Sequence, residues 1–178
     1  MFTETTGGDL IESTTSVTIA DDHSLYAQWT IIDYTITYYL DEGTNNISNP
    51  ATYTIEDVEI VILDATKEGY TFDGWFNEDL ITPAVTTIET GSTGDVEFYA
   101  VWTINQYTIT FDSNEGSVVA PITQDYGTSV VAPDPDPTKE LYKFEYWCSD
   151  IETTQEYVFE TMPAENITLY AKWHLIET

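Results

Sequence analysis

A sequence repeat runs through the whole chain and restricts its fold more than any other feature. Three segments close with the motif Leu/Phe-Tyr-Ala-x-Trp, and their tyrosines, Tyr26, Tyr99 and Tyr170, are 73 and 71 residues apart. Two further motifs recur in the same order and at similar spacing: Tyr-Thr-Ile-Thr from residues 34 and 107, and Tyr-x-Phe-x-x-Trp from residues 70 and 142. Self-similarity at a fixed period indicates tandem copies of one structural unit.

The repeat divides the chain into unequal parts. We predict a first complete repeat at residues 31–103 and a second complete repeat at residues 104–174, with a short tail at 175–178. Residues 1–30 match only the C-terminal half of a repeat and are interpreted as a truncated copy. Because half a repeat cannot bury its own apolar face, we expect this part to be loosely held unless it docks elsewhere. The copies are joined by about four residues, which predicts a short rod rather than independently tumbling units.

Apolar side chains alternate with a period of two in the recurring segments, for example at residues 34–40, 95–102 and 166–173. This alternation is typical of half-buried β-strands. Residues 55–67 are also predicted to be strand, since they are rich in β-branched residues, and prolines in the aligned part of the next copy exclude a regular helix there. Asp-Glu-Gly at 41–43 and Asn-Glu-Gly at 114–116 are predicted turns. We therefore predict a mainly β fold, α+β at most, with four or five strands per repeat and at most one helical turn.

Large aromatic residues recur at fixed framework positions and are predicted to form the core of each copy. These framework rings are Tyr70, Phe72 and Trp75, their counterparts Tyr142, Phe144 and Trp147, and the closing tryptophans Trp29, Trp102 and Trp173. A small domain needs such a concentration of apolar area, because each buried ring contributes about 2–3 kcal/mol. The alternative is a sugar-stacking platform, which requires exposed, coplanar rings. The core is favoured because the rings belong to the repeat framework.

Charge excludes several classes of partner. The chain carries 32 acidic and 4 basic residues, a formal net charge of −28. We therefore expect no binding to nucleic acid, to anionic lipid surfaces or to sulfated polysaccharides, all of which require basic patches.

We expect no membrane insertion, since no apolar run approaches the ~20 residues of a membrane span, and the segment after Met1 does not resemble a secretory signal. Cys148 is the single cysteine and is predicted to be a buried hydrophobe.

The residues that could carry chemistry are few. His23 and His174 lie near no nucleophile motif, residues 112–116 are a predicted turn rather than a calcium loop, and residues 134–136 are a predicted rigid acidic loop. An intramolecular isopeptide crosslink would need a buried lysine, and we propose none. The available lysines are Lys67, Lys139, Lys143 and Lys172, of which Lys172 alternates onto the outward face. We predict no catalytic, cofactor-binding or metal-ligating residue, no cofactor, and a chain that is not an enzyme.

The order of these motifs resembles the internalin B-repeat, also called the Listeria–Bacteroides repeat. Tyr-Thr-Ile-Thr-Phe…Asn-Glu-Gly-Ser, Gly-Tyr-Thr-Phe-Asp-Gly-Trp and Asn-Ile-Thr-Leu-Tyr-Ala-Lys-Trp carry the resemblance, which covers nearly the whole chain. It implies a β-grasp-like fold with the helix reduced or absent, no catalytic residues to transfer, and tandem copies in secreted or wall-attached bacterial proteins. One departure is Glu145-Tyr146-Trp147, which stands where the first complete repeat has Asp73-Gly74-Trp75, so this central turn is expected to differ in shape.

Two functions follow as hypotheses. The first is an extracellular stalk or spacer module, on the bacterial cell surface or secreted, whose partners are the flanking domains of the same protein. The alternative is an adhesin-type binding module for a host protein or glycan, acting through a sheet edge or an aromatic patch. Burial of the framework rings favours the first and a coplanar exposed set favours the second. The oligomeric state is left open.

Overall fold

The computed structural model describes residues 1–16 and 21–176, and within these residues the regular structure is entirely β-strand. The first complete repeat contains β1 (Tyr34–Tyr39), β2 (Thr52–Tyr53), β3 (Ile60–Val61), β4 (Tyr70–Phe76), β5 (Thr87–Ile88) and β6 (Val96–Ile104). The second contains β7 (Gln106–Asp112), β8 (Ile122–Asp125), β9 (Tyr142–Cys148) and β10 (Ile167–Leu175). The predicted mainly β fold is confirmed. The second repeat has four strands, as predicted. The prediction of four or five is wrong for the first repeat, which has six because β3 and β5 form an additional two-stranded sheet.

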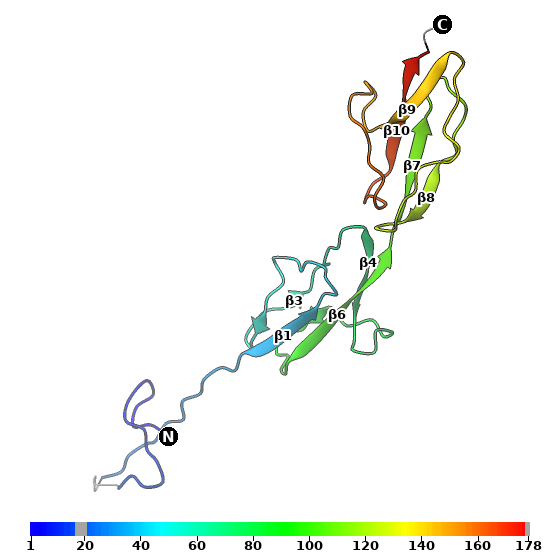
Figure 1. Ribbon diagram of the computed structural model, residues 1–178. Coiled ribbons are helices and arrows are strands. Elements are labelled where there is room, and N and C mark those ends of the chain that lie inside the picture. The colour runs from blue at the N-terminus through cyan, green and yellow to red at the C-terminus, as the bar shows by residue number, and fades with distance from the viewer. Residues whose placement is uncertain (17–20, 177–178) are drawn as a thin grey trace.

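Both complete repeats build the same four-stranded mixed sheet. The strand order is β2-β1-β6-β4 in the first and β8-β7-β10-β9 in the second. The two central strands, β1 with β6 and β7 with β10, run parallel, and the outer strands pair antiparallel to them. The sheets lie end to end in an elongated molecule, with the termini at opposite ends (Figure 1). The β-grasp assignment stays a prediction.

The alternation of side chains explains the strands. In β6 and β10 the same pattern repeats, with Phe98 and Ala100, and likewise Leu169 and Ala171, buried on the inner face. The strands predicted at 34–40, 95–102 and 166–173 agree with β1, β6 and β10 to within about two residues. The strand predicted at 55–67 is mostly wrong, because only residues 60–61 of it are strand. The predicted central turn at 73–75 is wrong: these residues lie within β4, where the register shifts between Phe72 and Gly74. β9 and β10 show the equivalent register shift without a glycine. The backbone at this position still differs as expected, because Gly74 has a φ of 131° and Tyr146 is not among the residues with a positive φ.

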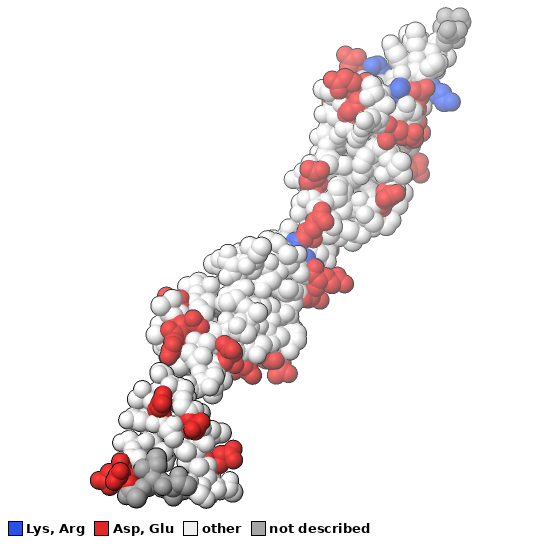
Figure 2. Space-filling model, turned by 90° about the vertical axis from the view of Figure 1, so that its left-hand side faces the viewer, with Lys and Arg blue, Asp and Glu red and all other residues white. Residues whose placement is uncertain are grey.

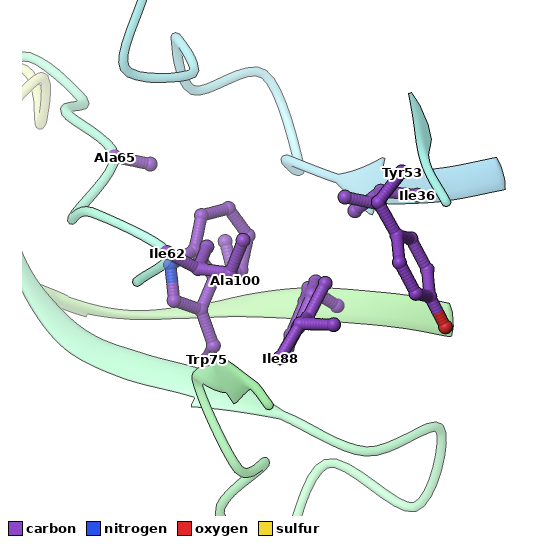
Figure 3. Close-up of a cluster of buried hydrophobic side chains, with 8 residues drawn as sticks. Ile36, Tyr53, Ile62, Ala65, Trp75, Ile88 and Ala100 are labelled. Atoms are coloured by element: carbon purple, nitrogen blue, oxygen red, sulfur yellow. The ribbon is translucent and has the colours of Figure 1, made fainter. Parts of the chain in front are cut away.

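Each complete repeat has its own hydrophobic core. Figure 3 shows the first, in which Trp75 is clustered with side chains that come from residues 36 to 100 of the chain. The buried residues of the first core are Ile36, Tyr53, Ile62, Ala65, Trp75, Ile88, Phe98 and Ala100. Those of the second are Ile109, Phe111, Val130, Trp147, Met162, Leu169 and Ala171. Trp75 and Trp147 are 2% and 3% exposed, and Cys148 is fully buried, as predicted.

Two predicted core positions and one predicted strand position are exposed, each for a local reason. Trp29 is 91% exposed, because the described residues of the segment 1–30 include no strand and turn like those on which Trp102 packs. Tyr142 is 36% exposed, whereas its counterpart Tyr70 is partly covered by the ring of Tyr126 from the next repeat. Val58, predicted to lie in a strand, is 79% exposed, since the strand there is limited to residues 60–61.

The described residues of the predicted half repeat at 1–30 reproduce one detail of a complete repeat. Phe2 forms isolated bridges with Leu10 and Tyr26, and these bridges correspond to those of Phe76 with Pro83 and Tyr99 in the first complete repeat. The hydrogen bonds of this segment among the described residues stay within residues 1–28. Residues 17–20 of the predicted half repeat and 177–178 of the predicted tail lie outside the described residues.

Candidate functional site at the junction of the two complete repeats

A single residue, Asn105, separates β6 of the first complete repeat from β7 of the second. Its backbone N–H donates a hydrogen bond to the carbonyl oxygen of Gly69 at 2.9 Å, within the first repeat. Its carbonyl oxygen accepts a hydrogen bond from the N–H of Tyr126 at 2.9 Å, within the second. The backbone at the junction is therefore fixed to both repeats at once.

The side chain of Asn105 repeats this double attachment. Its Oδ1 accepts a hydrogen bond from the hydroxyl of Thr71 at 2.6 Å, and its Nδ2 donates to the hydroxyl oxygen of Tyr107 at 3.3 Å. Thr71 belongs to β4 of the first repeat and Tyr107 to β7 of the second. An amide, with an acceptor at one end and a donor at the other, is suited to such a bridge.

The ring of Tyr126 closes the junction by lying directly on Gly69. It packs edge-on against Tyr70 and Tyr107, with centroid distances of 6.2 and 6.4 Å. A Cβ added to Gly69 would overlap Cδ1 of this ring, far inside van der Waals contact. Gly69 also has a φ of 76°, in the left-handed region that favours glycine. The close approach of the two repeats therefore requires glycine at this position.

A lysine supports the turn after the first strand in each complete repeat. Nζ of Lys67 donates to the carbonyl oxygen of Asp41 at 2.7 Å, and Nζ of Lys139 donates to that of Asn114 at 2.8 Å. Each ammonium also lies over a ring, that of Tyr70 or Tyr142, at 4.4 and 4.9 Å from the centroid. Two of the four basic residues thus have the same structural role. Sequence reasoning missed this role, although the two lysines are 72 residues apart, in register with the repeat.

The remaining predicted residues lie apart from one another. His23 and His174 are both exposed at distant places in the chain, and Nδ1 of His174 is 3.9 Å from Oε1 of Glu145. Residues 112–116 form the predicted turn, in which the N–H of Gly116 donates to the carbonyl oxygen of Ser113. Among residues 1–16 and 21–176, no three His, Cys, Asp or Glu side chains are grouped in a way that could hold a metal ion.

One aromatic pair is accessible on the outer face of the first sheet. Tyr39 and Tyr99 stack with centroids 4.3 Å apart, and both hydroxyls donate hydrogen bonds to the carboxylate of Glu97 at 3.1 Å. Beside them an open hollow is lined by residues that include Lys67 and Trp102. In the second complete repeat Asp112 pairs with Tyr170 in the same register, so the stacked pair is not repeated along the molecule.

We expect stability to fall in alkaline solution because of two tyrosines. Burial raises the pKa of Tyr38 to about 12, and burial together with the hydrogen bond to Glu97 raises the pKa of Tyr99 to about 12. Since the folded state favours the neutral phenols, their contribution is complete below pH about 10 and is lost as the pH rises toward about 12. The urea midpoint, followed by circular dichroism, should decline across this window, and less steeply in Tyr99→Phe. A midpoint that stays constant through the window would contradict this assignment.

Comparison with known proteins gives one family and several relatives. A family model described as the Listeria–Bacteroides repeat domain matches residues 34–101 and again 107–172. Two proteins of Evansella cellulosilytica are similar over 89% of the chain: one, named as a membrane protein, is 36% identical over 159 residues, and the other, named as a Gly-rich membrane protein, is 38% identical over 170 residues. Internalin H of Listeria monocytogenes is 35% identical over 121 residues, or 61% of the chain.

The chain covers 24%, 19% and 20% of the length of these three relatives, so it spans a quarter or less of each. The described residues contain no helix that is long and apolar enough to cross a membrane.

Proposed function

Because the chain belongs to the Listeria–Bacteroides repeat domain family, as its motifs predicted, we propose that it is an extracellular, non-catalytic spacer segment of a bacterial surface protein. In this role the two complete repeats hold flanking domains of the same protein at a set distance from the cell envelope. The names of its relatives, an internalin and two membrane proteins, support a cell-surface setting.

The observation that carries the proposal is the attachment of Asn105 to both repeats. A spacer holds its flanking domains at a set distance only if its units keep a fixed relative orientation. A flexible linker would not maintain that orientation. Here the linker is one residue long, and both its backbone and its side chain bond on each side of the junction. Burial of Trp75 and Trp147 agrees with this role, since the largest framework rings of the complete repeats are used in the cores.

The acidic surface suits a spacer. Figure 2 shows Asp and Glu side chains along the whole length of one face of the molecule. Because the chain has a net charge of −28, its copies repel one another and are repelled by the anionic polymers of the envelope. This repulsion favours an extended and soluble segment. The adhesin-type alternative would use the hollow beside Tyr39 and Tyr99, but that aromatic pair occurs in one complete repeat and not in the other.

The junction can be tested by measuring distances between the two complete repeats. Nitroxide labels at Val58→Cys and Val118→Cys, positions that are 79% and 96% exposed, report on one repeat each by double electron–electron resonance. The native thiol of Cys148 is fully buried, and burial raises its pKa, so it should not react with the label. We expect a single narrow distance distribution in the otherwise unchanged chain.

Asn105→Ala should broaden this distribution without unfolding either repeat. The change removes two side-chain hydrogen bonds, each worth about 0.5–1.5 kcal/mol, from the junction and none from the cores. Asn77→Ala is the matched control, because Asn77 is exposed and its side chain makes no hydrogen bond among the described residues. A broad distribution before any change at Asn105 would argue against a spacer of fixed direction.

A further inference from the structure

The C-terminal ends of the two complete repeats are built alike. At the first, the N–H of Asn105 donates to the carbonyl oxygen of Gly69 at 2.9 Å. At the second, the N–H of Ile176 donates to the carbonyl oxygen of Leu141 at 2.8 Å. Leu141 has a φ of 68°, close to the 76° of Gly69, so the backbone has the same conformation at both ends.

The two ends differ in what they can accept. Gly69 leaves room for the ring of Tyr126, whereas Leu141 places a side chain where a Cβ on Gly69 would meet that ring. The end of the second complete repeat is apolar and uncovered among the described residues, with Leu141, Leu175 and Ile176 exposed by 59%, 53% and 53%. A following unit with an aromatic ring at the position of Tyr126 could not approach this end in the same way.

The N-terminal ends differ in a complementary manner. Tyr126 lies two residues after Gln124, which pairs with Tyr107, and Ile55 lies two residues after Tyr53, which pairs with Tyr34 in the same register. Ile55 is therefore the counterpart of Tyr126 in the first complete repeat. It is 48% exposed and lines a hollow with Ile31 and Ile32, so this end offers aliphatic side chains instead of a ring.

We propose that the residues at the positions of Gly69 and Tyr126 form a matched pair that selects which repeat can dock after which. The apolar end formed by Leu141, Leu175 and Ile176 then fits a following repeat of the same family that carries an aliphatic residue at the position of Tyr126, as the first complete repeat does at Ile55. This inference rests on the proposed spacer function, since the pair selects neighbours only where repeats dock rigidly.

The test uses the nitroxide-labelled chain and introduces at position 69 the leucine that occupies the equivalent position, 141, of the second complete repeat. Gly69→Leu should lose the narrow distance distribution, because the leucine side chain displaces the ring of Tyr126. Adding Tyr126→Ile to Gly69→Leu should restore a narrow distribution. The repeat itself should remain folded, as Leu141 already adopts this backbone angle in the same chain. Gly127→Leu is the matched control: its φ is 72°, but nothing lies within 4 Å of an added Cβ, so the distribution should stay narrow.

The possible outcomes distinguish a failure of the matched pair from a failure of the spacer function. A broad distribution in the unsubstituted labelled chain contradicts the spacer function itself. A narrow distribution there that persists in Gly69→Leu, or that stays lost in Gly69→Leu/Tyr126→Ile, overturns the matched pair and leaves the spacer function standing. If circular dichroism shows that Gly69→Leu unfolds the first complete repeat, Gly69→Ala with Tyr126→Ala makes the same comparison with smaller side chains.

Discussion

Replacing Trp75 with alanine is expected to unfold the first complete repeat while the second stays folded. The indole is 2% exposed, its ring centroid lies 5.3–6.0 Å from the rings of Tyr38, Phe72 and Phe98, and its Nε1 donates to the carbonyl oxygen of Leu63 at 3.1 Å. Trp→Ala in a core costs about 3–5 kcal/mol. A domain of this size holds only about 3–5 kcal/mol from its single core, so the loss consumes most of its stability.

Amide NMR spectra of the isotopically labelled protein, without nitroxide labels, would show this directly. The signals of residues 34–104 should collapse toward random-coil positions, and those of residues 106–175 should be retained, because the two cores share no residue. Trp29→Ala is the matched control: it removes the same side chain from a site that is 91% exposed, and should change little. Collapse of both repeats in Trp75→Ala would show that they fold as one unit, contrary to this expectation.

Gly43→Ala should also destabilise the first complete repeat, by about 1–3 kcal/mol through overpacking. An added Cβ would lie 2.5 Å from Cζ2 of Trp102 and 3.0 Å from the carbonyl oxygen of Leu40. The ring cannot move away easily, because its Nε1 donates to that same carbonyl at 3.0 Å. Gly116 stands in the same relation to Trp173, at 2.5 Å, so Gly116→Ala should have the same effect on the second repeat.

A double-mutant cycle of Gly43→Ala with Trp102→Ala isolates the part of the stability loss that comes from steric overlap with the Trp102 ring. In that background the ring is absent, and the alanine at position 43 should cost much less than it does with the ring present. Urea unfolding of the four variants gives the coupling free energy, which we expect to be about 1–3 kcal/mol. Additive losses would mean that the glycine is needed for another reason.

Much of the fold could be predicted from the sequence because it is periodic in two ways. The alternation of Val96, Phe98 and Ala100 identified an inner face, and repetition of the same pattern at residues 167–171 strengthened the assignment. Trp75 and Trp147 could be placed in cores because a ring retained at a framework position must be buried for a small domain to be stable. These inferences depend on residues within one strand or one copy.

The junction could not be predicted, because it depends on contacts between copies. No local pattern indicates that Asn105 bonds to both repeats, or that Gly69 accepts the ring of Tyr126 from the next one. The exposure of Tyr142 has the same origin, since its burial would need a neighbouring ring that the described residues do not supply. The predicted turn at 73–75 failed because a β-bulge and a turn both favour glycine, and the residue types alone do not separate them.

The parallel pairing of the first and last strands determines how each complete repeat responds to a pull along the molecule. The chain enters the first repeat at the start of β1 and leaves it at the end of β6, and these two strands are directly hydrogen-bonded from Ile36 opposite Val96 to Tyr39 opposite Tyr99. Tension between the ends therefore acts along both strands and shears the whole ladder at once, instead of opening it one bond at a time. The pairing of β7 with β10 loads the second repeat in the same way, so mechanical strength is built into each unit at its central strands.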